Sequence, residues 1–197
     1  MKTLIVSLRC CAVTLVLCGL IYPAAVTALA HLLFAHQAGG SLIGDADGKI
    51  VGSELIGQEF SDAAYFHGRP SAGNGDPMSS GGSNSGPTSR ALKERIASAA
   101  RRLAGEYGTP VPIDLVTTSG SGLDPHITPL SAQLQVARVA AARGVSPELL
   151  REIVDRFTQP RDFWILGEAR VAVLPLNLAL DARFGAPRRR DGSAPAN

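Results

Sequence analysis

An uninterrupted apolar stretch near the amino terminus, Cys10 to Ala30, constrains this 197-residue chain more than any other feature. Its 21 residues carry no charge, and at about 1.5 Å of rise per residue they would form a helix about 31 Å long. That length matches the hydrocarbon core of a bilayer, roughly 30 Å thick. Pro23 lies inside the stretch, and membrane-spanning helices tolerate proline. The sequence therefore predicts one transmembrane anchor within residues 1–34.

The charges around this stretch predict its orientation. Lys2 and Arg9 precede it, and the next charged residue is Asp45. Basic residues that flank a spanning helix favour the cytoplasmic side, so we expect a cytoplasmic amino terminus and a domain outside. A cleaved secretory signal is the alternative, because residues 28–30 read Ala-Leu-Ala, as a cleavage site does. Apolar residues continue through 32–34, which favours a retained anchor.

The composition of the remaining chain limits what the domain can be. About 160 residues are enough for one domain with a hydrophobic core. Removing Lys2 and Arg9 from the 19 basic residues leaves 17, which equals the 17 acidic residues. We expect no nucleic-acid partner, since phosphate binding needs a net basic face. The three cysteines, Cys10, Cys11 and Cys18, all lie in the anchor, so a domain over residues 35–187 has neither a disulfide nor a thiolate metal site.

Helix and strand signals are mixed along this domain, which predicts an α+β fold. Four segments have helical periodicity or caps: Leu92–Tyr107 before Gly108 and Pro110, Pro129–Gly144 after Thr128, Pro147–Phe157 after Ser146, and Pro175–Leu180 before Gly185. Three segments have the composition of strands: Lys49–Val51 after a turn at Asp47-Gly48, Val111–Thr117, and Arg170–Leu174. We therefore expect one compact mixed domain over residues 35–187.

Two segments of the chain predict no regular element. Residues 71–89 are rich in Gly, Ser, Asn and Pro, which indicates a long loop inside the domain. A loop of this length is usually functional or disordered, and composition alone does not decide between the two. The last segment, residues 188–197, begins with three arginines and is predicted to be a disordered, solvated tail.

Asp124 and His126 place a carboxylate and an imidazole close together after a flexible Ser-Gly run. Such a pair could belong to a metal site or a serine hydrolase, but a metal site needs three or four ligands. A nucleophile elbow needs glycine two places before its serine, and neither Ser119 nor Ser121 has one. We predict that Asp124 caps a turn through its side chain, and an acid–base role stays the alternative.

The glycine-rich run from Ser80 to Asn84 raises the question of nucleotide binding. Backbone amides in such a loop can cradle an anion. However, the chain has no G-x-x-x-x-G-K-[ST] motif, so a self-contained nucleotide site is not expected. A flexible loop shaped to fit another protein surface is the favoured interpretation.

Four ordered blocks of residues carry a family resemblance that covers the chain from the anchor to about Phe184. The blocks are Leu55–Gln58 with Tyr65-Phe66 and Arg69–Ala72; Ser80–Asn84 with Gly86-Pro87; Asp114–Thr117 with Ser119–Ile127; and Arg170-Val171 with Leu176–Asp181. Together with the anchor, they resemble the C subunit of the bacterial Kdp potassium-transporting ATPase. Four blocks in order are far more specific than any single motif.

The resemblance implies an accessory subunit of a high-affinity, ATP-driven potassium uptake complex in the bacterial inner membrane. Its partners would be a P-type ATPase subunit, a potassium-channel-like subunit, a very small stabilising subunit and membrane lipid. The family implies a role in assembly and as a catalytic chaperone for ATP binding by the ATPase subunit. ATP, Mg and K would be used by the complex, with no cofactor assigned to this chain. The main domain would be periplasmic.

The resemblance assigns no catalytic residue to this chain, and it implies a set of residues for subunit contact or a nucleotide-related role. The set is Ser80, Gly81, Gly82, Ser83, Asn84, Asp124, His126 and Gln135. The alternatives are an anchored or secreted periplasmic hydrolase that uses Asp124 and His126, a periplasmic ligand-binding or adhesion module, and an assembly chaperone that leaves the finished complex.

Overall fold

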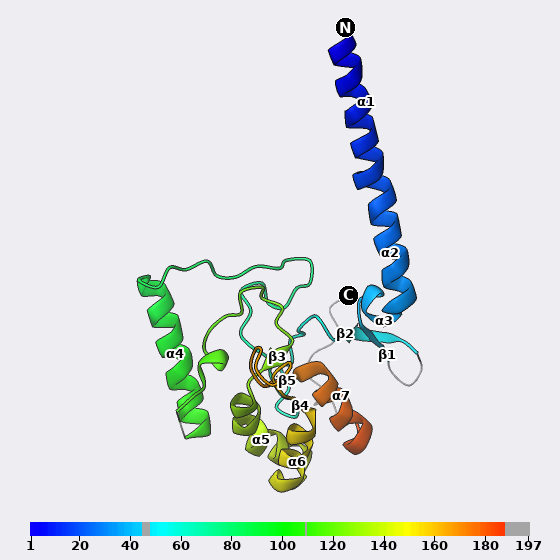
Figure 1. The fold of residues 1–197 in the computed structure, drawn as a ribbon. Helices are drawn as coiled ribbons and strands as arrows, with labels where there is room; N and C mark the ends of the chain where they lie inside the picture. Colours follow the sequence, from blue (N-terminus) through cyan, green and yellow to red (C-terminus); the bar gives the residue numbers. More distant parts are fainter. Residues whose placement is uncertain (45–47, 109, 188–197) are drawn as a thin grey trace, which may run out of the picture. The chain divides into compact units, whose positions relative to one another are not determined.

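The computed structural model describes residues 1–44, 48–108 and 110–187, and the chain divides into two compact units (Figure 1). The first unit is Met1–Ser53 and the second begins at Glu54. Asp47, part of the predicted turn, and the tail at 188–197 lie outside the described residues. The predicted mixed fold is confirmed, because both helices and antiparallel strands are present.

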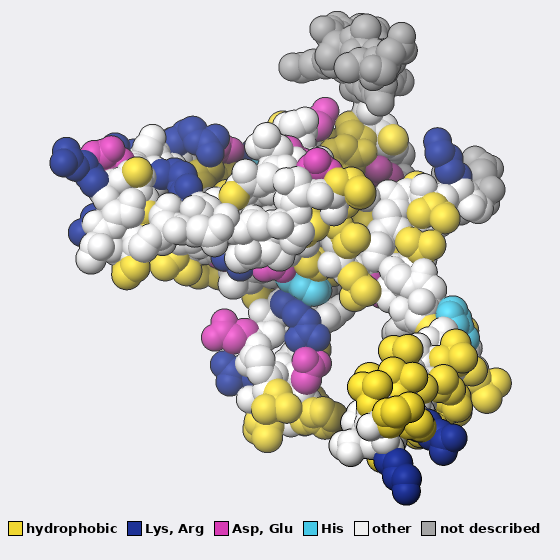
Figure 2. Space-filling view, turned by 90° about the horizontal axis from the view of Figure 1, so that it is seen from above, with side chains coloured by type: hydrophobic (Ala, Val, Ile, Leu, Met, Phe, Trp, Pro, Cys, Tyr) yellow, Lys and Arg dark blue, Asp and Glu magenta, His cyan; other side chains and the backbone are white. Residues whose placement is uncertain are grey.

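The first unit is dominated by a long apolar helix. Its parts are α1 (Lys2–Val16), the π-helical turn η1 (Leu17–Ile21) and α2 (Tyr22–Leu33). Lys2–Leu33 is the one helix, among the described residues, that is long and apolar enough to cross a membrane, and none of its most apolar window is buried. Figure 2 shows these apolar side chains as an exposed yellow surface.

The π-helical turn has a local cause in Pro23. Proline lacks an N–H group, and its ring collides with the carbonyl four residues earlier, here that of Gly19. In η1 the backbone N–H of Tyr22 donates to the carbonyl of Leu17, five residues back. This wider turn accommodates the proline while the helix continues.

A short helix and a hairpin complete the first unit. The helix α3 spans Ala35–Ala38, and β1 (Leu42–Gly44) pairs antiparallel with β2 (Ile50–Ser53). The predicted strand at 49–51 is therefore confirmed from Ile50 onward. The Ser53 hydroxyl donates to the Gly40 carbonyl at 2.7 Å, which ties the end of β2 to the residues after α3.

The helices of the second unit begin and end close to the predicted residues. They are α4 (Arg90–Tyr107), α5 (Pro129–Arg143), α6 (Pro147–Phe157) and α7 (Val173–Phe184). The side chains of Ser89, Thr128 and Ser146 cap the first three, and Gly108 and Gly144 end α4 and α5 in the left-handed conformation that favours glycine. The predictions for the first three are confirmed, whereas α7 starts two residues earlier and ends four residues later than predicted.

A small antiparallel sheet lies beside these helices, in the order β3-β5-β4. Its strands are β3 (His126–Ile127), β4 (Thr158–Gln159) and β5 (Arg170–Ala172), with Ile127 and Thr158 both opposite Val171. The predicted strand at 170–174 is confirmed over its first three residues. Val173 and Leu174 instead open α7, because Pro175 fits the first turn of a helix, where an N–H group has no acceptor within the helix.

The predicted strand at 111–117 was wrong. The chain there forms a three-residue 3-10 helix, η2 (Ile113–Leu115). Pro110 and Pro112 cannot donate to a ladder of strand hydrogen bonds. Asp114 is buried and accepts hydrogen bonds from the Thr128 N–H at 2.9 Å and the Ser131 hydroxyl at 2.5 Å, so this segment braces the start of α5.

The hydrophobic core lies among α5, α6, α7 and the small sheet (Figure 1). It contains Phe66, Ile127, Ala132, Val136, Val139, Ala140, Leu150, Ile153, Val154, Val171, Val173, Leu176 and Leu180. By contrast, α4 has no buried residue, and basic side chains gather along it in Figure 2. Residues 54–89 form no helix or strand, which agrees with the predicted loop at 71–89.

Candidate functional site

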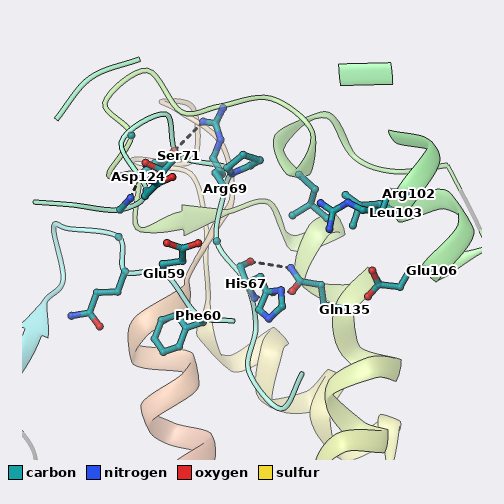
Figure 3. A pocket seen from close by; sticks show the side chains of 18 of the residues that line it. Glu59, Phe60, His67, Arg69, Ser71, Arg102, Leu103, Glu106, Asp124 and Gln135 are labelled. Atoms are coloured by element: carbon teal, nitrogen blue, oxygen red, sulfur yellow. Dashed lines mark hydrogen bonds and ion pairs between the residues drawn. The ribbon is translucent and has the colours of Figure 1, made fainter. Parts of the chain in front are cut away.

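A cleft of about 330 Å³, lined by both polar and apolar side chains, lies within the second unit (Figure 3). One wall comes from the irregular segment, with Glu59, His67 and Arg69, and the other comes from α4, with Arg102 and Glu106. Two residues of the predicted set, Asp124 and Gln135, line it. Ser80–Asn84 and His126 are not among its lining residues.

The backbone that forms the irregular wall is held by two buried amide side chains. Asn177 on α7 accepts from the Phe66 N–H and donates to the Phe66 carbonyl, both at 2.9 Å. Gln135 on α5 does the same for His67, at 2.8 and 3.1 Å. Both side chains are only 1% exposed. Each amide thus satisfies a backbone N–H and C=O that no strand partner satisfies, buried at Phe66 and partly buried at His67.

The sequence placed Gln135 among the candidate site residues but did not predict that it holds the backbone, and it did not single out Asn177. A polar amide amid apolar helix residues, as in Leu176-Asn177-Leu178, was the available signal. Such a residue is buried only when its hydrogen bonds are met. The partner here is backbone from more than 60 positions away, and side-chain patterns do not encode that pairing.

Asp124 closes a turn, as predicted. Its carboxylate accepts from the His126 backbone N–H at 3.0 Å and from the Arg69 guanidinium at 3.0 Å. Partial burial alone would raise the pKa of Asp124, but hydrogen bonds from His126 and Arg69 outweigh it and lower the pKa to about 2. Asp124 is therefore ionised at neutral pH, and its charge is matched by Arg69.

The Ser80–Asn84 loop packs against the backbone after η2. The Gly81 N–H donates to the Ser121 carbonyl at 2.7 Å, and the Ser80 hydroxyl reaches the same oxygen at 3.0 Å. A Cβ on Gly82 would lie 2.9 Å from the Gly120 carbonyl oxygen. Arg95 of α4 donates to the Ser83 hydroxyl at 3.1 Å. This loop needs glycine at position 82 because two backbone segments approach closely there.

An arginine, a carboxylate and a phenol join the irregular segment to α5 and α7. The Arg143 guanidinium, on a side chain 3% exposed, lies 2.8 Å from Asp181 and donates to the Ala64 carbonyl at 2.7 Å. The Tyr65 hydroxyl donates to Asp181 at 2.8 Å, and Arg143 stacks over the Tyr65 ring. Burial, then the hydrogen bond to Asp181 and its charge, raise the pKa of Tyr65 to about 12.

The hydrogen bonds and charges around the cleft limit the reactions that its side chains could catalyse. Burial first, and then the charge of Arg138, lower the pKa of His67, so its imidazole is neutral at pH 7. Arg138 itself contacts Tyr107 and Gln135, at 3.1 and 2.8 Å. Among the described residues, no three His, Cys, Asp or Glu side chains gather to hold a metal ion. Hydrogen bonds and ion pairs thus hold several of the charged side chains that line the cleft in fixed positions.

The hydrolase alternative is not supported. The Asp124 carboxylate is bonded to Arg69 and closes the turn at His126. Ser119 is 2% exposed, which shuts it off from a substrate, and the Ser121 hydroxyl accepts from the nearby Leu123 N–H at 3.1 Å. An activated serine needs a base within hydrogen-bond reach and access to its substrate.

Comparison with known proteins gives the family. The family described as KdpC, the c chain of the K⁺-transporting ATPase, matches residues 4–182. The chain belongs to this family. The match spans both units and includes all four blocks on which the resemblance rested, so the resemblance is confirmed.

Curated relatives agree with the KdpC assignment along nearly their full length. The KdpC subunit of Myxococcus xanthus is 55% identical over 189 residues, covering 93% of this chain and 90% of the relative. That of Koribacter versatilis is 50% identical, covering 96% and 99%. That of Gloeobacter violaceus is 49% identical, covering 83% and 87%. This KdpC chain is thus a subunit of a potassium-transporting ATPase complex, and partner subunits are implied.

Proposed function

We propose that this chain is an accessory, non-catalytic subunit that holds an ATP-driven potassium uptake complex together from outside the membrane. The observation that carries the proposal is the family match over residues 4–182 on a chain with one exposed apolar helix ahead of a folded unit. A subunit with a single anchor and a separate domain can bind its partners both within the bilayer and beside it.

The proposed topology places the amino terminus in the cytoplasm and the second unit in the periplasm, with the helix in the bacterial inner membrane. Lys2 and Arg9 support this orientation, because they are the charged residues on the amino-terminal side of the apolar stretch. The exposed apolar side chains of the stretch from Cys10 to Ala30 then face lipid or other spanning helices, an environment in which their apolar surface carries no penalty.

The proposed partners are a P-type ATPase subunit, a potassium-channel-like subunit, a small stabilising subunit and lipid. We infer that the second unit covers the outer mouth of the channel-like subunit. The anchor supports this arrangement, since tethering raises the effective concentration of the domain at its partner and lets modest contacts hold it there. ATP, Mg and K are used by the complex, and this chain need bind none of them.

The proposed effect on ATP binding is indirect. Gln135, a residue considered for nucleotide contact, uses its amide on the His67 backbone, and the Ser83 hydroxyl accepts from Arg95. ATP is a cytoplasmic substrate, whereas the proposed topology puts these groups outside. A chaperone-like effect on the ATPase subunit would therefore pass through assembly of the complex and not through a shared nucleotide site.

Co-purification tests the proposal. The tagged full chain is drawn from native membranes in mild detergent, with mass spectrometry and a potassium-stimulated ATPase assay on the eluate. We expect a P-type ATPase and a channel-like subunit in fixed ratio with this chain, with activity. A lone chain without activity would contradict the proposal, and partners present only early after synthesis would indicate a departing chaperone.

Topology has its own test. The three native cysteines are replaced by alanine, and Ser98 on the exposed face of α4 is changed to cysteine. A membrane-impermeant maleimide added outside spheroplasts should label Ser98→Cys without permeabilisation. A cysteine at position 3, introduced as Thr3→Cys, is the matched control and should react only after permeabilisation. The reverse pattern would refute the proposed orientation.

A further inference from the structure

Four consecutive apolar side chains project from the turn between β4 and β5. Phe163, Trp164, Ile165 and Leu166 are 83, 84, 75 and 56% exposed. Apolar residues scattered singly over a surface are ordinary, but a contiguous group of this size marks a contact site. We refer to residues 163–166 as the apolar tip.

The apolar tip has a fixed and strained backbone. Asp162 and Leu166 pair with each other through two hydrogen bonds of 2.9 Å, and the Ile165 N–H donates to the Asp162 carbonyl at 3.3 Å. The two central residues, Phe163 and Trp164, have φ of +51° and +66°. This is the turn that Asn-Gly usually makes, and each bulky residue in it costs roughly 1–2 kcal/mol. Backbone strain of this kind clusters at ligand clamps and other functional sites, which supports a role for these two side chains.

The base of the apolar tip carries balanced charge. Arg170 pairs with Asp162 at 3.2 Å, and Arg161 and Glu168 are exposed nearby in sequence. Two basic and two acidic residues therefore flank the tip. Surfaces that bind anionic lipid are rich in Lys and Arg instead. An apolar centre with a polar rim is the arrangement of a protein–protein hot spot, where Trp is enriched.

We propose that the apolar tip is an anchor that inserts into an apolar pocket on a protein subunit in the same membrane. The proposal rests on the accessory-subunit function above, which supplies such partners. A preformed turn presents the aromatic rings with little ordering cost on binding, an advantage in a shaped pocket and none in fluid lipid. Its four residues are far fewer than the roughly 20–30 residues that each partner contributes to a standard interface, so the tip acts together with the membrane anchor.

Photo-cross-linking identifies the molecule that the apolar tip contacts. A benzophenone amino acid replaces Trp164 in the full chain in native membranes, and Leu130, 68% exposed at the start of α5, is the matched control position. We expect an adduct between this chain and one partner subunit from position 164, several-fold stronger than from position 130. Equal yields at both positions, or lipid adducts alone, would overturn the proposal.

The chain's single tryptophan allows a direct check on lipid. The full chain, without partners, is placed in vesicles that contain brominated phospholipid. We expect Trp164 to emit as an exposed indole and to escape quenching by bromine. Strong quenching with a blue shift would assign the tip to the bilayer and overturn the proposal.

A variant that keeps the turn and removes the two aromatic side chains of the apolar tip separates binding from folding. Phe163→Asn with Trp164→Gly supplies the pair that this turn prefers, so the melting temperature should stay the same or rise. We expect about tenfold or greater loss of partner retained through a stringent wash. Full retention of the partner by a folded variant would refute the proposed role of the apolar tip while leaving the accessory function intact. Failure of the unchanged chain to retain partners would instead refute the accessory function.

Discussion

Residues 127–184 and residues 54–89 belong to the same unit but are held in place by different interactions. The first region buries the apolar faces of α5, α6 and α7 and the strand β5 against one another. The second region has no helix or strand, and among the described residues Phe66 is its one member of the core cluster. Buried amides, an ion pair and close glycine contacts hold the rest. Regular structure is therefore not required for a fixed shape, provided that every buried backbone group has a partner.

The largest effect is expected from a core residue of the helical region. Leu176→Ala removes a fully buried side chain from α7 and should lower the free energy of unfolding by about 2–5 kcal/mol. Leu130→Ala, on a side chain 68% exposed, is the control and should change it by less than about 0.5 kcal/mol. Chemical denaturation of the full chain in detergent measures both. Equal effects would mean that packing does not hold this region.

The next effect tests the join between the two regions. Asn177→Leu keeps the size of the side chain but leaves the Phe66 N–H and C=O without partners, which should cost about 2–4 kcal/mol. Gln133→Leu is the control, because the hydrogen bond that the structure describes for Gln133, to Asp155 at 3.0 Å, is exposed. A stable Asn177→Leu variant would show that residues 54–89 are held without this amide.

A smaller effect is expected from the ion pair of the irregular region. The pKa of Asp124 is lowered to about 2, so its stabilisation is present above the unfolded pKa near 4 and is lost as pH falls toward 2. Asp124→Asn should therefore be less stable than wild type by about 1 kcal/mol at pH 7, after allowance for solvent screening, and no less stable near pH 2. Denaturation curves across this range measure the difference. A gap that does not change with pH would exclude the carboxylate charge as its cause.

An effect of similar size at one position, and almost none at the next, is expected for two adjacent glycines. A Cβ on Gly82 would lie 2.9 Å from the Gly120 carbonyl oxygen, whereas one on Gly81 would meet nothing within 4 Å. Gly82→Ala should lower the melting temperature by the equivalent of about 1 kcal/mol, and Gly81→Ala should leave it nearly unchanged. If both variants melt like wild type, the loop is looser than the structure shows.

Local signals predicted the helices of the second unit well. Ser146-Pro147 begins α6 and Gly144 ends α5, because a capping hydroxyl, a proline in the first turn and a left-handed glycine act within a few residues. The segment at 111–117 was wrong for the opposite reason. Its β-branched residues suggested a strand, but Asp114 accepts hydrogen bonds from Thr128 and Ser131 at the start of α5, which are 14 and 17 positions away.

The candidate site was only partly accessible from the sequence. Asp124 was predicted to close a turn and does so, since an Asx turn needs only the next two residues. The pairing of Arg69 with Asp124 and of Gln135 with His67 joins residues 55 and 68 positions apart. No local pattern specifies which of many backbone groups such a side chain will reach. The assignment of Ser80–Asn84, Asp124, His126 and Gln135 to subunit contact or a nucleotide-related role stays a prediction.

The sequence by itself determined the long apolar helix, the caps that begin α4, α5 and α6 and end α4 and α5, and the family, since each depends on residues read in order along the chain. Only the tertiary structure decided that Asn177 and Gln135 act as strand-like partners for Phe66 and His67, and that Phe163–Leu166 is exposed. A sequence does not show that an amide side chain is buried or that an aromatic side chain is exposed. Whether a side chain meets water or another part of the chain is fixed by packing across long separations, and that packing exists only in the folded protein.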